Sequence, residues 1–316
     1  MGNLPRLIFC LAGNRTHMQI ARDCGWEAGA RLPGTLYEQH APLVFADQNW
    51  VTYQRALAQS PAAAAKCRAA YMQAVAAARP EMASVLDWEY ADQLSEVLEW
   101  AHEIAPYVQR VMLIPKVVGQ VDRLPNEIAG VPVVLGYSIP TTHGGTRCGL
   151  REFAGRRVHL LGGSPRQQLQ AAQLLAQKAP SASLVSVDGN MCHQASGRGT
   201  YWQAGRWRND GAGATPTTEA LRRSLTNIRR DWLRLLRLFG AQGLRPDRHR
   251  RTVGAGQGAG AAHVPRRAGR GDARVRRGAA AHGLRGLPDS EGAHRLSLAV
   301  RRFELRREDT QDGLAR

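Results

Sequence analysis

The sequence lacks the roughly 20 consecutive apolar residues that a helix needs to cross a bilayer. Its N-terminus also lacks the long apolar region and cleavage site of a signal peptide. The five cysteines are odd in number and widely spaced, and no CxxC pair occurs. Scattered cysteines of this kind are typical of proteins whose thiols stay reduced. We therefore expect a cytoplasmic protein that does not contact a membrane.

Acidic residues are scarce. The chain of 316 residues holds 26 Asp and Glu against 43 Lys and Arg, so the formal net charge is +17. Such an excess often indicates binding to nucleic acid. The charge is unevenly placed, because residues 240–316 carry 17 Arg against 8 acidic residues, about half of the excess.

The segment 240–316 also lacks Ile, Met, Trp, Tyr, Cys, Asn and Lys, and Arg, Gly and Ala dominate it. This composition cannot bury enough apolar surface to offset the entropy cost of folding. It could be a basic arm that binds phosphates, a plain flexible extension, or the product of a reading-frame shift in a GC-rich gene. We favour the frame shift, because the amphipathic pattern stops abruptly near Phe239. The sequence thus predicts a domain over 1–239 that has lost its C-terminal part, and a low-complexity tail over 240–316.

Seven short apolar runs predict strands in the body of the chain, over residues 6–13, 42–47, 84–90, 110–117, 131–138, 157–163 and 184–190. Most are continuously apolar, which is typical of parallel strands covered on both faces. Helical patterns follow several of them, over 60–80, 90–106, 164–180 and 215–239. This alternation predicts an α/β fold, either a (β/α) barrel of the TIM type with its last unit incomplete or a doubly wound sheet.

Polar residues follow the predicted strands, where the working residues of α/β barrels lie. Asp47, Asp87 and Asp188 each end an apolar run, and Tyr137 and Asn190 occupy similar positions. Asp188 precedes a glycine, so it is either a carboxylate exposed at a barrel mouth or simply part of an Asp-Gly turn. Asp47 and Asp87 leave the same two readings open.

Two glycine pairs are candidates for close contact with a ligand. Gly162 and Gly163 precede Ser164-Pro165, where a helix N-terminus could bind an anion or where an ordinary capped turn could lie. Gly144 and Gly145 could let the backbone approach a planar ligand, or form a flexible loop.

The remaining candidates concern metal and nucleic acid. Cys148, Cys192, His143 and His193 match no zinc spacing, so we predict no metal site and see no cofactor. The predicted helix 215–239 carries Leu221, Leu225, Ile228 and Trp232 on one face. Its other face bears Arg222, Arg229 and Arg230, which either track phosphates or are simply solvated.

The segments PLVFADQNW, SVLDWEY, VVLGYSIPTTHGG, VHLLGGSP and VSVDGN, taken in order, resemble the signature segments of tRNA-guanine transglycosylases. The likeness is closer to the divergent bacterial and phage paralogs of the DpdA type, which insert 7-deazaguanines into DNA. It covers roughly residues 43–207, about half of the chain.

The resemblance implies a role for each matching residue. Asp188 lies at the position of the nucleophilic aspartate, Asp47 at that of an aspartate that transfers protons, and Asp87 at that of one that recognises the base. Gly144 and Gly145 match a loop that contacts the base, and Gly162 and Gly163 a segment beside the phosphate. The implied partners are DNA or tRNA and a 7-deazaguanine base.

The sequence departs from the family pattern in two places. The first concerns the segment after Asp47, and the second concerns the substrate. Gln48-Asn49-Trp50 stands where the family has Gly-Gly-Phe, and the four-ligand Cys/His zinc motif of the tRNA enzymes is absent. The second departure favours DNA over tRNA. The alternatives from other classes are a barrel hydrolase or lyase that acts on a small molecule with the same three aspartates, and an inactive relic.

Overall fold

The computed structural model describes residues 4–10, 15–34, 42–141, 144–211 and 214–239. We predicted that the tail does not fold and that it comes from another reading frame. Both predictions concern residues 240–316, which lie outside this description.

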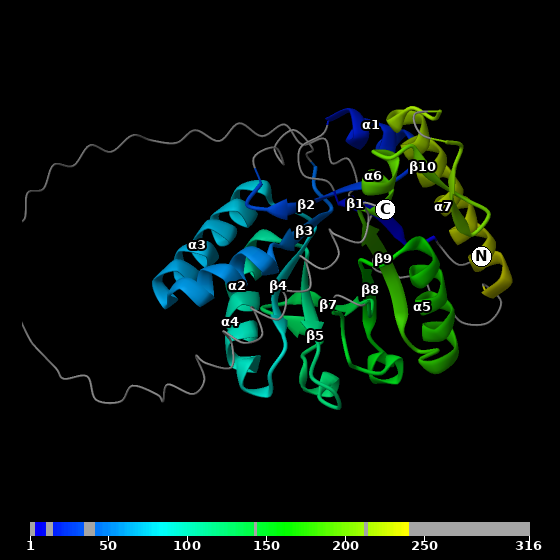
Figure 1. Ribbon diagram of the computed structural model, residues 1–316. Coiled ribbons are helices and arrows are strands. Elements are labelled where there is room, and N and C mark those ends of the chain that lie inside the picture. The colour runs from blue at the N-terminus through cyan, green and yellow to red at the C-terminus, as the bar shows by residue number, and fades with distance from the viewer. Residues whose placement is uncertain (1–3, 11–14, 35–41, 142–143, 212–213, 240–316) are drawn as a thin grey trace, which may run out of the picture. The chain divides into compact units, whose positions relative to one another are not determined.

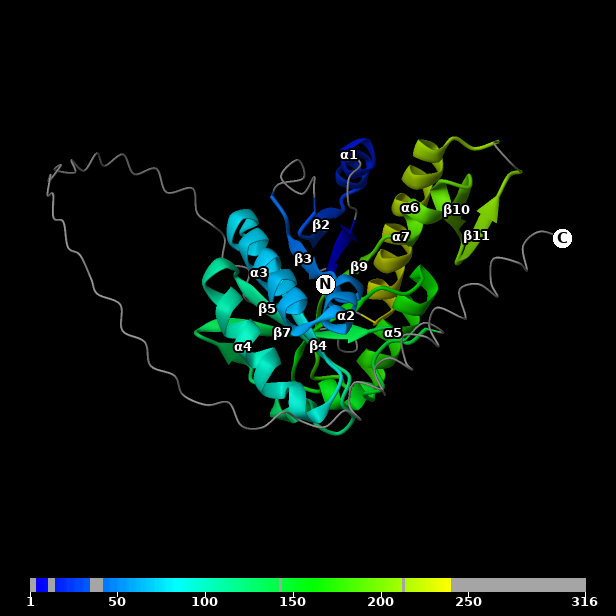
Figure 2. The same ribbon diagram turned by 60° about the vertical axis from the view of Figure 1, so that its left-hand side comes forward.

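The central feature is a closed barrel of eight parallel strands (Figures 1 and 2). Pairing of β5 with β7 and of β9 with β1 closes the ring. The strands are β1 (Arg6–Cys10), β2 (Glu27–Leu32), β3 (Phe45–Gln48), β4 (Met82–Trp88), β5 (Arg110–Pro115), β7 (Val131–Ser138), β8 (Arg157–Leu161) and β9 (Ser183–Gly189). The short β6 (Glu127–Ile128) pairs antiparallel with β7. The prediction of a TIM-like α/β barrel is confirmed at this level, and the doubly wound sheet is excluded.

The prediction of seven strands and a missing last unit is wrong. All seven predicted strands are present, and the eighth is β2, which was not predicted. Its sequence, EAGARL, has small residues in place of an apolar run. At Gly29 the need for a small residue has a clear cause, because a Cβ there would lie 2.6 Å from Cys10 Sγ on β1. The barrel therefore closes before Phe239 and needs no residue of the segment 240–316.

Helices surround the barrel on the outside (Figures 1 and 2). They are α1 (Arg15–Asp23), α2 (Trp50–Gln59), α3 (Pro61–Ala78), α4 (Leu94–Ile104), α5 (Pro165–Lys178), α6 (Met191–Ser196) and α7 (Thr217–Phe239). A hairpin of β10 (Thr200–Gln203) and β11 (Arg206–Asn209) joins α6 to α7. No helix in the described ranges is long and apolar enough to cross a membrane.

Two apolar cores hold the fold together. The larger lies between strands and helices and includes Phe9, Trp100 and Trp232. The smaller fills the barrel itself with Ile8, Phe45, Met82, Met112, Ile114, Val134 and Val185. Because side chains alternate along a strand, the next inward positions lie nearer the carboxyl ends of the strands. Four of these positions hold Cys10, Asp47, Ser84 and Asp188. We call this end of the barrel the mouth.

Candidate active site at the barrel mouth

Asp188 is the last residue but one of β9, and several hydrogen bonds fix its position. It is 7% exposed, and its Oδ1 accepts hydrogen bonds from His159 Nε2 at 3.2 Å and from the backbone N–H of Gly162 at 3.0 Å. The Gln168 side chain donates to the carbonyl oxygens of Asp188, at 2.6 Å, and of Gly162, at 2.9 Å. These bonds tie the ends of β8 and β9 together and fix the position of the carboxylate.

Asp47 is the last residue but one of β3 and interacts electrostatically with Asp188. Its Oδ1 accepts a hydrogen bond from Ser84 Oγ at 3.3 Å. Its Oδ2 lies 3.4 Å from Arg31 Nε, which belongs to a side chain that is 59% exposed. Ser84 also accepts from the backbone N–H of Gln48 at 2.8 Å, so the turn after β3 is anchored to β4.

The two carboxyl groups differ in acidity. Burial and, to a smaller extent, the charge of Asp188 raise the pKa of Asp47 to about 7, although Arg31 opposes the shift. Burial opposes ionisation of Asp188 as well, but the hydrogen bonds from His159, Gly162 and Cys10 hold its pKa below the ordinary value. Near neutral pH the mouth thus pairs an ionised Asp188 with an Asp47 that can carry a proton. When the pKa values of two neighbouring carboxyl groups differ in this way, one group can act as the nucleophile and the other as the acid.

Cys10 ends β1, next to both groups. Burial raises the pKa of its thiol well above the usual value, and the charges of Asp188 and Asp47 add to the effect. The thiol therefore stays protonated, and it serves Asp188 as a hydrogen-bond donor.

Asp87, at the end of β4, belongs to a second group of charges. Lys116 Nζ lies 2.7 Å from Asp87 Oδ2 and 2.8 Å from Glu89 Oε1. The same ammonium lies 5.2 Å from the centre of the Trp50 ring. Burial raises the pKa of Asp87, and Lys116 opposes this shift. The structure thus places Asp87 at the mouth, paired with a lysine.

The glycines after β8 act on Asp188 and on the neighbouring loop. Gly162 has a φ of 64°, a conformation that glycine adopts without strain, and its N–H is directed to Asp188. A Cβ on Gly163 would lie 2.9 Å from Ile139 Cγ2. Ser164 and Gln167 form a capping box at the start of α5. The segment therefore contains an ordinary helix cap, and the backbone N–H of Gly162 donates to the carboxylate of Asp188.

The loop after β7 folds back over the end of β5. Thr146 Oγ1 donates to the carbonyl oxygen of Pro115 at 2.7 Å, and Thr141 pairs with Gly144 in an isolated bridge. Gly145 has a φ of 124°, and a Cβ there would lie 2.6 Å from Pro140 Cα. Glycine is therefore required at 145 by the backbone itself.

Two other predicted residues lie apart from the carboxylates. Tyr137 is buried against Phe153, with ring centres 5.4 Å apart. The preceding Gly136 faces the barrel interior, because a Cβ there would meet Ile114 and Leu161, so Tyr137 points the other way. Asn190 occupies the N-cap position of α6 without a capping hydrogen bond from its side chain, which instead accepts one from Gln194 at 3.3 Å.

The three arginines lie on the exposed face of α7. Arg222 pairs with Asp23 at 3.6 Å, Arg229 lies beside Gly25, and Arg230 donates to Asn227 at 3.3 Å. Asp23 and Gly25 precede β2, whose opposite end carries Arg31. The structure does not bring these arginines to the mouth.

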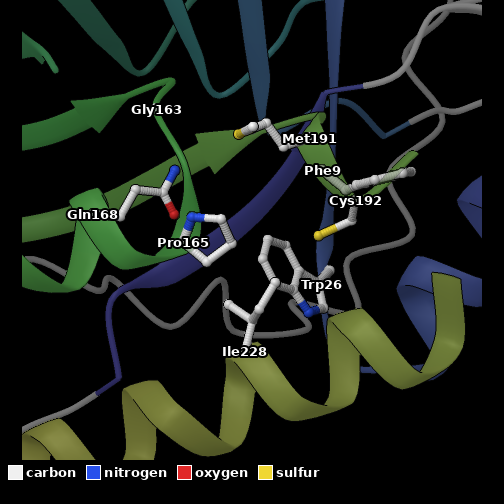
Figure 3. A pocket seen from close by; sticks show the side chains of 9 residues that line it. Phe9, Trp26, Gly163, Pro165, Gln168, Met191, Cys192 and Ile228 are labelled. Carbon is white, nitrogen blue, oxygen red and sulfur yellow. The ribbon is translucent and has the colours of Figure 1, made fainter. Parts of the chain in front are cut away.

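A small pocket lies outside the barrel wall, among β1, β9, α5, α6 and α7 (Figure 3). Its lining is mainly apolar and includes Phe9, Trp26, Met191, Cys192 and Ile228. It contains none of the three aspartates, so we place the candidate site at the mouth.

All five cysteines are free thiols. Cys148 and Cys192 are buried, and His193 Nδ1 lies 2.8 Å from His17 Nδ1. His143 lies outside the described residues. Within the described ranges no group of three or more His, Cys, Asp or Glu side chains is arranged to hold a metal ion.

Several residues of the site were not predicted, namely Cys10, Arg31, Ser84, His159, Gln168 and Ser186. Three of them are polar residues within buried strands, which is itself an informative signal. Ser186 lies two residues before Asp188 and so faces the same side of β9. That spacing could have identified it.

The fold and the polar end of the barrel define an α/β-barrel protein with a carboxylate-rich site. A family model described as a family of unknown function, DUF6610, matches residues 21–233. This is more than half of the chain, so the protein belongs to that family. The match runs from α1 into α7 and includes every barrel strand except β1. No curated protein matches the sequence significantly.

Proposed function

We propose that the protein exchanges a base at a glycosidic carbon of nucleic acid, replacing guanine with a 7-deazaguanine. DNA is the proposed substrate, ahead of tRNA. The observation that carries the proposal is that Asp47, near the end of β3, and Asp188, near the end of β9, lie at one barrel mouth. There the pKa of Asp188 is lowered and that of Asp47 is raised to about 7. Retaining exchange at a sugar carbon needs one carboxylate as nucleophile and one group that transfers protons.

The reaction then has two displacements. An Asp188 oxygen attacks the sugar carbon, the bond to guanine breaks, and Asp47 gives its proton to the departing base. The incoming base attacks the same carbon, returns a proton to Asp47, and releases Asp188. Because the target base must leave the stack to reach a barrel mouth, the enzyme acts on a flipped or single-stranded nucleotide.

The test is incorporation of labelled guanine or 7-deazaguanine into DNA and tRNA by the purified protein. Measurable exchange into DNA supports the proposal. No exchange into either nucleic acid would contradict it and favour the small-molecule hydrolase or lyase, which would use the same three aspartates.

Asp87→Asn should change which base is accepted and leave some exchange. The substitution keeps the size of the side chain, but it replaces an acceptor-only carboxylate with a group that also donates. We expect the preference between guanine and its analogues to change by about 10- to 100-fold. The measurement is competition between labelled bases. Glu89→Gln is the matched control, because it removes the other carboxylate on Lys116. Equal changes in both variants would mean that the lysine, and not Asp87, determines the preference.

Neutralising Arg222, Arg229 and Arg230 together to Gln tests whether this face of α7 tracks the backbone. If it does, affinity falls similarly for all sequences, and the slope of log affinity against log salt flattens by up to about 3. A control with the exposed Arg55, Arg79 and Arg151 changed to Gln alters the net charge equally. Identical affinities for both triple variants would show that the α7 arginines are only solvated.

A further inference from the structure

His159 contacts Asp188 from within the barrel. It lies in the middle of β8 and is fully buried. One ring nitrogen, Nδ1, lies 2.7 Å from Ser186 Oγ, and the other, Nε2, lies 3.2 Å from Asp188 Oδ1. Its ring also packs against Phe45, with ring centres 5.1 Å apart.

These contacts determine where a hydrogen must lie. A carboxylate oxygen only accepts, so Nε2 carries a hydrogen in either charge state of the ring. Ser186 is itself 2% exposed and holds the opposite side of the ring. The side chains of Ser186, His159 and Asp188 therefore form a chain in which each member fixes the orientation of the next.

The chain acts on one carboxylate oxygen. Both His159 and the Gly162 N–H donate to Oδ1 of Asp188, and the Cys10 thiol is a further donor to this carboxylate. His159 and Gly162 thus fix Oδ1 and do not occupy Oδ2. A nucleophile held by one oxygen presents the other in a constant direction.

We propose that His159 is a positioning residue for Asp188, held by Ser186, and that it orients the carboxylate so that Oδ2 attacks the sugar carbon. The role in catalysis rests on the proposed function. The hydrogen bond itself can be measured without activity, because it also keeps Asp188 ionised.

The test compares three variants. His159→Leu removes the donor, His159→Gln keeps an amide donor near the position of Nε2, and Ser186→Ala removes the support. We expect kcat of the Leu variant to fall about 100-fold with KM little changed, as for a misplaced reacting group. The Gln variant should recover most of this loss, and the Ala variant should lie between the two.

The pH profile separates positioning from a merely structural role. Activity requires ionised Asp188, so the acidic limb of the profile should move upward by about one unit or more in the Leu variant and return in the Gln variant. Equal activity loss in the folded Leu and Gln variants, or an unmoved limb in the Leu variant, would overturn the proposal.

Titration of the Asp188 carboxyl by ¹³C NMR gives the same information without substrate. A midpoint raised in His159→Leu and restored in His159→Gln supports the role of His159, even if the wild type exchanges no base and the proposed function fails. An identical midpoint in all three proteins would contradict the role of His159, whatever the activity.

Discussion

Asp188→Asn should keep the barrel and lose base exchange by several orders of magnitude. Asn has nearly the same size and can occupy the same position near the end of β9. It can still accept the hydrogen bonds of His159 and Gly162 through its amide oxygen. It has no negative charge, however, and cannot form the covalent bond to the sugar carbon. Loss of a nucleophile lowers kcat and kcat/KM together.

The measurement is incorporation of labelled base, with circular dichroism to confirm the fold. Asp122→Asn is the matched control, since Asp122 is exposed and lies in a short 3₁₀ turn away from the described site residues. Near-normal exchange by Asp188→Asn would remove Asp188 from the mechanism.

Asp47→Asn should make the protein more stable at alkaline pH than the wild type. The pKa of Asp47 is raised from 3.8 to about 7 in the folded state, so the folded protein holds a proton that the unfolded chain releases. The stability that this proton contributes is present below pH 4 and is lost as the pH rises through 7. At about 1.4 kcal/mol per pKa unit, the loss reaches at most about 4 kcal/mol. Asn cannot ionise, so the variant does not suffer this loss.

Denaturant unfolding between pH 4.5 and 8.5 measures this effect. The free energy of unfolding of Asp47→Asn, relative to wild type, should increase with pH by about 2–4 kcal/mol. Asp122→Asn should show no such trend. Parallel stability curves for the wild type and Asp47→Asn would mean that Asp47 ionises normally in the fold.

The same substitution should affect exchange. If Asp47 gives its proton to the departing base, wild-type kcat/KM declines as the pH rises through about 7. Asp47→Asn should lower exchange by about 10²- to 10⁴-fold and abolish that decline.

The sequence predicted most of the barrel because its strands are apolar. Seven strands were recognised from continuous runs such as those of β5 and β9. The eighth could not be, since the close approach of Cys10 selects Gly29 where a strand usually carries a large side chain. This contact joins residues distant in sequence, and no local pattern reveals it. Missing β2 made a closed barrel look incomplete.

Candidate site residues near the ends of strands were predicted from the sequence. Those within strands were missed. Asp47, Asp87 and Asp188 follow apolar runs, and the structure places all three at the mouth. His159 and Ser186 lie inside such runs. A single polar residue within an apolar run does not indicate a site until its partner on another strand is known. Tyr137 shows the reverse error, because alternation along β7 turns it away from the barrel interior next to Gly136.

The central claim is that Asp188 forms a covalent bond to a sugar carbon. The most direct measurement is mass spectrometry of the wild-type protein, incubated with guanine-containing oligonucleotide without incoming base, then denatured and digested. We expect a covalent nucleic-acid adduct on the peptide that contains Asp188, released by added base in the native protein and absent in Asp188→Asn. Exchange of labelled base with no adduct on that peptide, or with an adduct on another residue, would contradict the account.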